Sequence, residues 1–364
     1  MVLPEPLPNV SSLPRYVPGA RGSASGPAPI KLSSNENALA PLPSVAQAIA
    51  TAGGSVNRYP DMFAGELVNA LAERQGVAPE NVIVGAGSVA VLAHLLQAYA
   101  GPGREVVYAW RSFEAYPILT ALTGATPVTA PLAPDGRHDL DAMAALITDD
   151  TAAVMVCSPN NPTGPAVTAD EFAAFVDKVP PSVLVVLDEA YVEFVTDASA
   201  VDGNRYIGDD AWKAHPNVVV LRTMSKAYGL AGLRVGFAFG LSDVLAPVRA
   251  CVTPFSVSSV AQTAALASLA AQDELLARVE GIVAERERVV AALAADGWSV
   301  PDAQGNFVWI GARERTGELV AHLGSQSPAI LVRPFADEGV RITIGDPEEN
   351  DAVIAGLAGL GWRV

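Results

Sequence analysis

One lysine of this chain stands among residues suited to chemistry. Lys226 is one of four lysines in 364 residues, and it lies in the segment LRTMSKAYGLAGLRVG, after Thr223 and Ser225 and before Arg234. A lysine amine attacks carbonyl compounds once its pKa is lowered, and hydroxyl groups beside an arginine can bind a phosphate. The neighbouring glycines and alanines allow a bound group to approach the backbone closely. A surface turn is the alternative interpretation, but a surface turn does not require such small neighbours.

Acidic and amide side chains follow two further apolar segments. Asp188 ends the run VLVVLD, where its carboxylate could pair with a protonated ring nitrogen, and Tyr191 could reach the same ring. The alternatives are an aspartate that caps a helix and a metal site of the Walker type, although no Gly-x-x-x-x-Gly-Lys loop accompanies it. Asn161 lies between prolines in SPNNPTG, where its amide could donate to a phenolate oxygen or the segment could be an ordinary turn.

A glycine-rich turn, Gly85–Val89, precedes an apolar helical stretch. The free amides of Ser88 and Val89 and the positive end of that helix could bind a phosphate, although such a short turn is weak evidence alone. Together the four motifs supply an amine nucleophile, a phosphate site, an acid for a ring nitrogen and an amide for a phenolic oxygen. Pyridoxal phosphate carries all four matching groups. The sequence therefore predicts this cofactor, and the chemistry requires no metal.

Short apolar segments alternate with helical stretches from about Leu42 onward. This alternation predicts an α/β fold with a mixed, mostly parallel sheet covered by helices on both faces. Ligands of such sheets bind at the carboxyl ends of the strands, and nearly every motif above follows one of the expected strands. These strands are Val82–Val84, Glu105–Tyr108, Ala152–Cys157, Val183–Leu187, Val218–Leu221 and Val235–Phe239.

Three regions are expected along the chain: an N-terminal arm over 1–34, a large cofactor-binding domain over 35–245 and a small α/β domain over 246–364. The arm is rich in Pro, Gly and Ser and is expected to wrap a neighbouring subunit. The small domain begins with a long helical segment. Its further elements are the strands Asn306–Gly311, Ile330–Val332 and Val340–Ile344 and a closing helix, Pro347–Leu357, with an acidic first turn.

Charge and hydropathy exclude some classes of function. The chain has 23 basic and 39 acidic residues, a formal net charge of −16, so nucleic acid is not expected as a partner. No apolar run approaches the roughly 20 residues of a membrane span, and Met1–Pro8 lacks the pattern of a signal peptide. A cytoplasmic protein without a membrane partner is therefore expected.

The motifs together resemble one enzyme family over nearly the whole chain. They are similar to fold-type I pyridoxal-phosphate aminotransferases of the histidinol-phosphate aminotransferase subgroup. The resemblance implies small amino and 2-oxo acids as substrates and a homodimer with shared active sites. The segments that carry it are SSNEN at Ser33–Asn37, NRYP at Asn57–Pro60, SPNNPTG, DEAY, SKAYGLAGLR and VRITIG at Val340–Gly345.

The resemblance also assigns roles residue by residue. Lys226 would bind the cofactor covalently and move the substrate proton, and Asp188 would pair with the ring nitrogen. The remaining cofactor contacts would be Asn161 and Tyr191 at the ring hydroxyl, Phe113 stacked on the ring, Thr223, Ser225, Arg234 and the amides of Ser88 and Val89 at the phosphate, and Tyr59 at the phosphate of the neighbouring subunit. The substrate contacts would be Arg341 at the α-carboxylate, Asn161, Arg333 and Tyr16.

The choice of substrate depends on finer features. The segments YVPG, WRSFEAYP and VRPFADEGVRITI are more similar to actinobacterial aromatic (phenylalanine) aminotransferases than to typical histidinol-phosphate enzymes. In the latter the region between the two arginines is usually longer, whereas Arg333 and Arg341 are eight positions apart here. Aromatic transamination is therefore expected first, histidinol-phosphate transamination second and decarboxylation of a phospho-amino acid third. Arg333 matches a phosphate contact of the histidinol-phosphate enzymes, and a buried salt bridge would also explain it.

A catalytically silent sensor is the alternative from another class, as in transcription regulators that carry an aminotransferase-like domain. That interpretation requires a winged-helix segment or a lost lysine. Lys226 is in place, which favours an enzyme.

Overall fold

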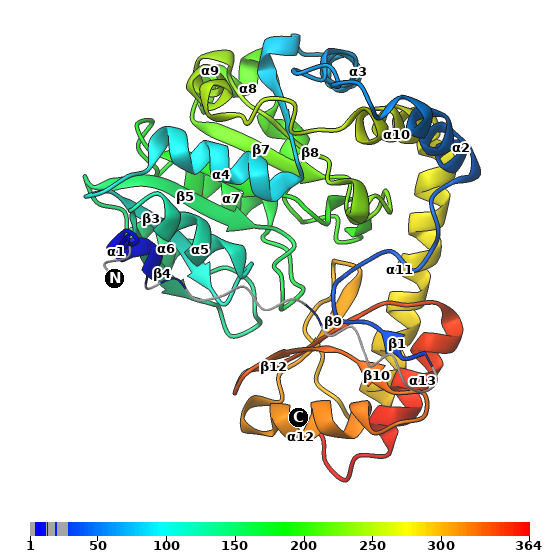
Figure 1. Cartoon of the computed structure of the whole chain (residues 1–364). Helices are drawn as coiled ribbons and strands as arrows, with labels where there is room; N and C mark the ends of the chain where they lie inside the picture. Colours follow the sequence, from blue (N-terminus) through cyan, green and yellow to red (C-terminus); the bar gives the residue numbers. More distant parts are fainter. Residues whose placement is uncertain (1–3, 12, 14–18, 20–27) are drawn as a thin grey trace.

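A seven-stranded sheet in the order β2-β8-β7-β6-β5-β3-β4 forms the upper part of the molecule in Figure 1. The structure is a computed structural model that describes residues 4–11, 13, 19 and 28–364. All neighbouring strands are parallel except β8, which is antiparallel to both β2 and β7. The strands are β2 Val82–Gly85, β3 Glu105–Trp110, β4 Thr126–Pro131, β5 Thr151–Cys157, β6 Leu184–Asp188, β7 Val218–Thr223 and β8 Gly236–Phe239.

Helices cover both faces of this sheet, and the alternation of side chains along the strands explains why. In β3, Val106 and Tyr108 pack with one apolar cluster, whereas Val107 and Ala109 pack with another. Since successive side chains of a strand point to opposite faces, a central strand with both faces covered is buried throughout and mostly apolar, as β5, β6 and β7 are. The first face is covered by α4 Ser88–Tyr99, α5 Ala115–Leu122 and α9 Ser242–Cys251, and the second by α6 Leu140–Ala145 and α7 Ala169–Val176.

A smaller antiparallel sheet in the order β11-β12-β9 forms the lower part of the molecule (Figure 1). Beside it, β1 near the N-terminus pairs in parallel with β10, so residues from both ends of the chain share one core. The bounds are β1 Ile30–Lys31, β9 Phe307–Ile310, β10 Ile330–Leu331, β11 Arg333–Phe335, β12 Gly339–Thr343, α12 Thr316–Gly324 and α13 Pro347–Ala358. Asp346 and Glu349 form a capping box at the start of α13, which agrees with its acidic first turn.

The long helix α11, Gln272–Ala295, runs from the upper part to the lower part (Figure 1). Its first turns pack in an apolar core of the upper part through Leu275 and Val279. Its later turns pack in the apolar core of the lower part through Val289 and Leu293. The remaining helices are α1 Pro8–Ser11, α2 Pro43–Ala52, α3 Gly65–Gln75, α8 Asp209–Ala214 and α10 Ser259–Ala270.

The predicted α/β fold and every strand expected from the sequence are present, with ends shifted by one or two residues. Three strands were not predicted: β1, β4 and β11. The sequence of β4 is TPVTAP, largely exposed at the edge of the sheet, so it lacks an apolar pattern. The domain division at 245 remains a prediction. The helix α10, which follows that position, packs with α2 and α3 in an apolar core of the upper part of the molecule. Among the described residues, no helix is long and apolar enough to cross a membrane.

Candidate active site

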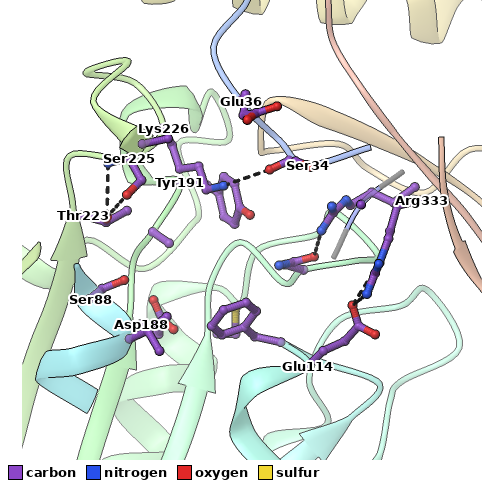
Figure 2. A pocket seen from close by; sticks show the side chains of 18 of the residues that line it. Ser34, Glu36, Ser88, Glu114, Asp188, Tyr191, Thr223, Ser225, Lys226 and Arg333 are labelled. Atoms are coloured by element: carbon purple, nitrogen blue, oxygen red, sulfur yellow. Dashed lines mark hydrogen bonds and ion pairs between the residues drawn. The ribbon is translucent and has the colours of Figure 1, made fainter. Parts of the chain in front are cut away.

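A cavity lies where the carboxyl ends of strands of the large sheet face the small sheet (Figure 2). Almost all site residues expected from the sequence line it, although they come from widely separated segments. One expected residue, Tyr59, does not line the cavity, and another, Tyr16, falls outside the described residues. The expected residues in the cavity wall are Ser88, Val89, Phe113, Asn161, Asp188, Tyr191, Thr223, Ser225, Lys226, Arg234, Arg333 and Arg341.

Lys226 follows the end of β7, and its amine lies in the cavity wall. The Nζ atom donates to the backbone oxygens of Ser34 at 3.3 Å and Asn35 at 3.1 Å, from the segment after β1. Burial lowers the pKa of Lys226 to about 7, with a further contribution from the positive charge of Arg341. A large fraction of the amine is therefore unprotonated at neutral pH, the state in which it acts as a nucleophile or base.

Asp188 is the last residue of β6 and is buried. Its Oδ2 atom accepts a hydrogen bond of 2.8 Å from the hydroxyl of Tyr116, while the buried Oδ1 atom has no hydrogen-bond partner. Burial raises the pKa of Asp188 to about 6, and the bond from Tyr116 opposes this shift. A buried carboxylate oxygen without a donor is unfavourable by itself, and a protonated ring nitrogen would supply the missing donor and charge.

The structure contradicts one alternative interpretation of Asp188, the helix cap. The next helical turn, Val192–Phe194, begins after Tyr191, so Asp188 does not cap it. Among the residues that the structure describes, no group of three or more His, Cys, Asp or Glu side chains could hold a metal ion. Asp188 is a buried carboxylate in the wall of the cavity.

The hydroxyl groups of Ser88, Thr223 and Ser225 lie on the side of the cavity near Asp188 (Figure 2), and Arg234 also lines the cavity. Thr223 Oγ1 donates to Ser225 Oγ at 3.0 Å, and Arg234 Nη1 donates to the same Ser225 oxygen at 3.4 Å. Ser88 begins α4, after Gly87 with a φ of 86°. The positive φ favours glycine at this position, and a Cβ atom there would displace the guanidinium of Arg234. This arrangement fits an anion such as a phosphate.

Arg341 links the two sheets at the centre of the site. Its Nη1 atom donates to Asn161 Oδ1 at 2.6 Å, and its Nη2 atom donates to the backbone oxygen of Ser33 at 3.0 Å. On the same side, Asn35 Nδ2 donates to the hydroxyl of Tyr191 at 3.0 Å. The loop that carries Asn161 is fixed by its neighbour Asn160, whose side chain bonds to Ser112, Thr163 and His138. The site is thus rigidly supported by buried polar contacts.

Several functional residues were not predicted from the sequence. One short segment after β3 supplies two of them, Glu114 and Tyr116, next to Phe113, which lines the cavity as expected. Glu114 accepts hydrogen bonds from Arg333 Nε at 3.2 Å and Nη2 at 2.5 Å, so the ion pair suggested for Arg333 is present. The position of WRSFEAYP, directly after an expected strand, was the available signal. The other missed wall residues are Gly19, Ser33, Ser34, Glu36, Cys157, Ala190 and Ala231.

Tyr59 lies outside the cavity of its own chain. Its side chain is 83% exposed, and its ring lies 4.7 Å from that of Phe255 between centroids. The contact of Tyr59 with a neighbouring subunit therefore stays a prediction.

Comparisons with known proteins agree with this geometry. A family model described as aminotransferase class I and II matches residues 27–357. The chain is 53% identical over 342 residues to an aromatic amino acid aminotransferase of Streptomyces avermitilis, covering 94% of this chain and 93% of that protein. It is 55% identical over 345 residues to an enzyme of the same name from Thermobifida fusca, with 95% and 94% covered.

Among solved structures, the chain is similar to a histidinol-phosphate aminotransferase of Sinorhizobium meliloti in complex with pyridoxal 5'-phosphate. The TM-score is 0.87 at 29% identity, and 96% of each chain is covered.

Proposed function

Since this chain belongs to the class I and II aminotransferase family, we propose that it transfers amino groups between an aromatic L-amino acid and a 2-oxo acid such as 2-oxoglutarate. Pyridoxal phosphate is the proposed cofactor. The observation that carries this cofactor assignment is the buried Oδ1 atom of Asp188, which has no hydrogen-bond partner. The aromatic donor is supported by two relatives of that name at more than half identity over nearly the whole chain.

The residues of the cavity fit the groups of pyridoxal phosphate. Asp188 would hold the ring nitrogen, Ser88, Thr223, Ser225 and Arg234 the phosphate, and Asn161 with Tyr191 the ring hydroxyl. Phe113 would cover one face of the ring. When bound, the cofactor supplies an aldehyde carbon that amines attack and a pyridinium ring that accepts the electron pair released at the substrate Cα.

The protein positions the substrate and moves its proton. Arg341, with its planar guanidinium in the cavity wall, would bind the α-carboxylate through two hydrogen bonds. Lys226 has a pKa of about 7, so its amine can accept a proton from the substrate Cα and return one near neutral pH. Asp188 would remain ionised because the pyridinium beside it supplies the opposite charge.

We propose that the active unit is a homodimer. Tyr59 belongs to a set of exposed apolar side chains on neighbouring segments, which a second copy of the chain would cover. In that arrangement Tyr59 would contribute to the phosphate site of the other subunit. The exposed side chains are Val56, Tyr59, Met62, Phe63 and Phe255. Both cysteines are free, which suits the reducing cytoplasm where we propose that the enzyme acts.

Histidinol phosphate is the second candidate donor. The presence of Arg333 in the cavity wall favours it, because a second arginine could bind a phosphate on the substrate side chain. The pairing of Arg333 with Glu114 favours the neutral aromatic donor.

A half-reaction assay tests the proposed function. The cofactor-loaded enzyme is mixed with phenylalanine, tyrosine or histidinol phosphate alone, and the change in cofactor absorbance is followed. We expect the two aromatic amino acids to give the higher rate at limiting concentration. A much higher rate with histidinol phosphate would assign the second function instead.

A further inference from the structure

Two arginines stand opposite each other on neighbouring strands at the substrate side of the cavity. Arg333 on β11 and Arg341 on β12 are direct cross-strand partners in the antiparallel pair, and both line the cavity. Like charges at directly opposed positions of a sheet repel each other. Both side chains are almost fully buried, at 5% and 7% exposed, so solvent screens them little. Such a pair requires two negative partners.

One of these partners is built into the chain. Glu114, at the start of α5, reaches Arg333 from the large sheet, as Figure 2 shows, and one of its oxygens accepts two hydrogen bonds from the guanidinium. The α-carboxylate of the substrate would be the second partner, at Arg341. The carboxylate of Glu114 and the α-carboxylate of the substrate would together balance the positive charges of the two arginines. No further negative charge on the substrate side chain is then needed.

An aromatic pair lies beside Arg333. Its guanidinium carbon lies 5.7 Å from the ring centre of Phe335, and the corresponding carbon of Arg341 lies 6.0 Å from that ring. Phe335 packs in turn against Trp309, with 5.4 Å between ring centres. The neutral aromatic ring of a substrate would fit beside the ion pair of Arg333 and Glu114. A substrate with a distal carboxylate or phosphate would bring a third negative charge to two arginines.

We propose that Glu114 is a specificity-determining residue, which neutralises Arg333 so that the cavity prefers neutral side chains over anionic ones. A substrate with an anionic side chain binds only by displacing the carboxylate of Glu114 from Arg333. This inference rests on the proposed function, because it takes the α-carboxylate to bind at Arg341.

The test compares neutral and anionic donors in the cofactor-loaded enzyme. Half-reaction efficiencies are measured with phenylalanine, glutamate and histidinol phosphate for the wild type and for Glu114→Gln, which keeps the shape and removes the charge. We expect the ratio of anionic to neutral efficiency to rise at least about tenfold, because the buried guanidinium of Arg333 then loses the carboxylate of Glu114 and an anionic substrate can supply a negative charge in its place.

Glu338→Gln is the matched control. Glu338 pairs with Arg111, another arginine near Phe335, but neither residue of this pair lines the cavity. The control breaks a glutamate–arginine pair of the same chemistry and is expected to keep the wild-type ratio. A change in the ratio of the same size in both variants would overturn the proposal.

A double variant separates charge from structure. Glu114→Gln combined with Arg333→Gln removes both charges and is expected to restore the preference for phenylalanine. Thermal unfolding of each holoenzyme accompanies the kinetics. If Glu114→Gln does not fold, Arg333→Gln and the double variant carry the test: Arg333→Gln alone leaves Glu114 in the cavity and should disfavour glutamate more than the double variant does.

Binding of unreactive analogues gives an independent readout. Inhibition by 3-phenylpropionate and by glutarate reports the neutral and anionic preference without any chemical step, and Glu114→Gln should favour glutarate. An unchanged ratio in both the kinetic and the binding measurements overturns the inference, as does an equal loss with every donor. A wild-type enzyme without activity on phenylalanine would instead refute the proposed function.

Discussion

Replacing Asp188 by asparagine should stabilise the cofactor-free protein and lower its affinity for the cofactor. Asparagine has the same size and can keep the hydrogen bond from the hydroxyl of Tyr116, which lies 2.8 Å from Oδ2 in the structure. The substitution therefore removes one charge from a buried site where Oδ1 has no donor. Its effect on stability follows from the pKa of Asp188.

Burial raises that pKa from 3.8 to about 6 in the folded protein. Since a raised carboxyl pKa means that the folded state holds the proton more tightly, Asp188 lowers the free energy of unfolding as the pH rises from 3.8 to 6. A displacement of about two pKa units corresponds to roughly 3 kcal/mol. The asparagine variant lacks this titration, so its stability relative to the wild type should increase over the same range.

Urea unfolding of the cofactor-free proteins measures the difference. At a fixed protomer concentration, the advantage of the variant should be roughly 2 kcal/mol larger at pH 8 than at pH 4.5, since Asp188 is already partly ionised in the unfolded state at the lower pH. With saturating pyridoxal phosphate the order should reverse, because the cofactor stabilises the wild type more. A stability difference that is independent of pH, or an equal gain from the cofactor in both proteins, would refute the reasoning about Asp188.

Three further substitutions or titrations test other parts of the site. Arg341→Lys should lower kcat/KM for phenylalanine about 100-fold by removing the bidentate contact, whereas the half-reaction with 2-phenylethylamine, which has no carboxylate, should change little. Lys226 of the cofactor-free protein should react with pyridoxal at a rate that rises with pH and levels off above about pH 7, because only the neutral amine attacks; a rise continuing to pH 10 would contradict this. Tyr116→Phe removes a hydrogen bond that lowers the pKa of Asp188, so in the cofactor-free protein the pH range over which Asp188 lowers the free energy of unfolding should extend to higher pH, and an unchanged range in urea unfolding would leave Tyr116 a packing residue.

The sequence predicts which residues line the Asp188 side of the cavity, because most of these residues lie at or after strand ends. Asp188, Asn161 and Thr223 each follow or end a buried apolar strand, and the carboxyl ends of parallel strands meet at one edge of the sheet. Their types and their place after a strand are visible in the chain itself. Lys226 could be singled out for the same reason.

The substrate side is less visible in the sequence because it depends on contacts between distant segments. Glu114 meets Arg333 across 219 positions of the chain, and Asn35 reaches Tyr191 across 156. Asn35 and Glu114 lie in the motifs SSNEN and WRSFEAYP, but no local pattern shows which distant residues they contact. The strand β11 that carries Arg333 is only three residues long and contains a proline, so it lacks the alternation by which strands are predicted.

The most direct test of the account is the location of the covalent bond to the cofactor. The protein is loaded with pyridoxal phosphate, reduced with borohydride, digested and analysed by mass spectrometry. The account predicts that the pyridoxyl group is on Lys226, and that Lys31, Lys178 and Lys213 are unmodified at stoichiometric cofactor. Modification of another lysine, or no modification of Lys226, would contradict the central claim.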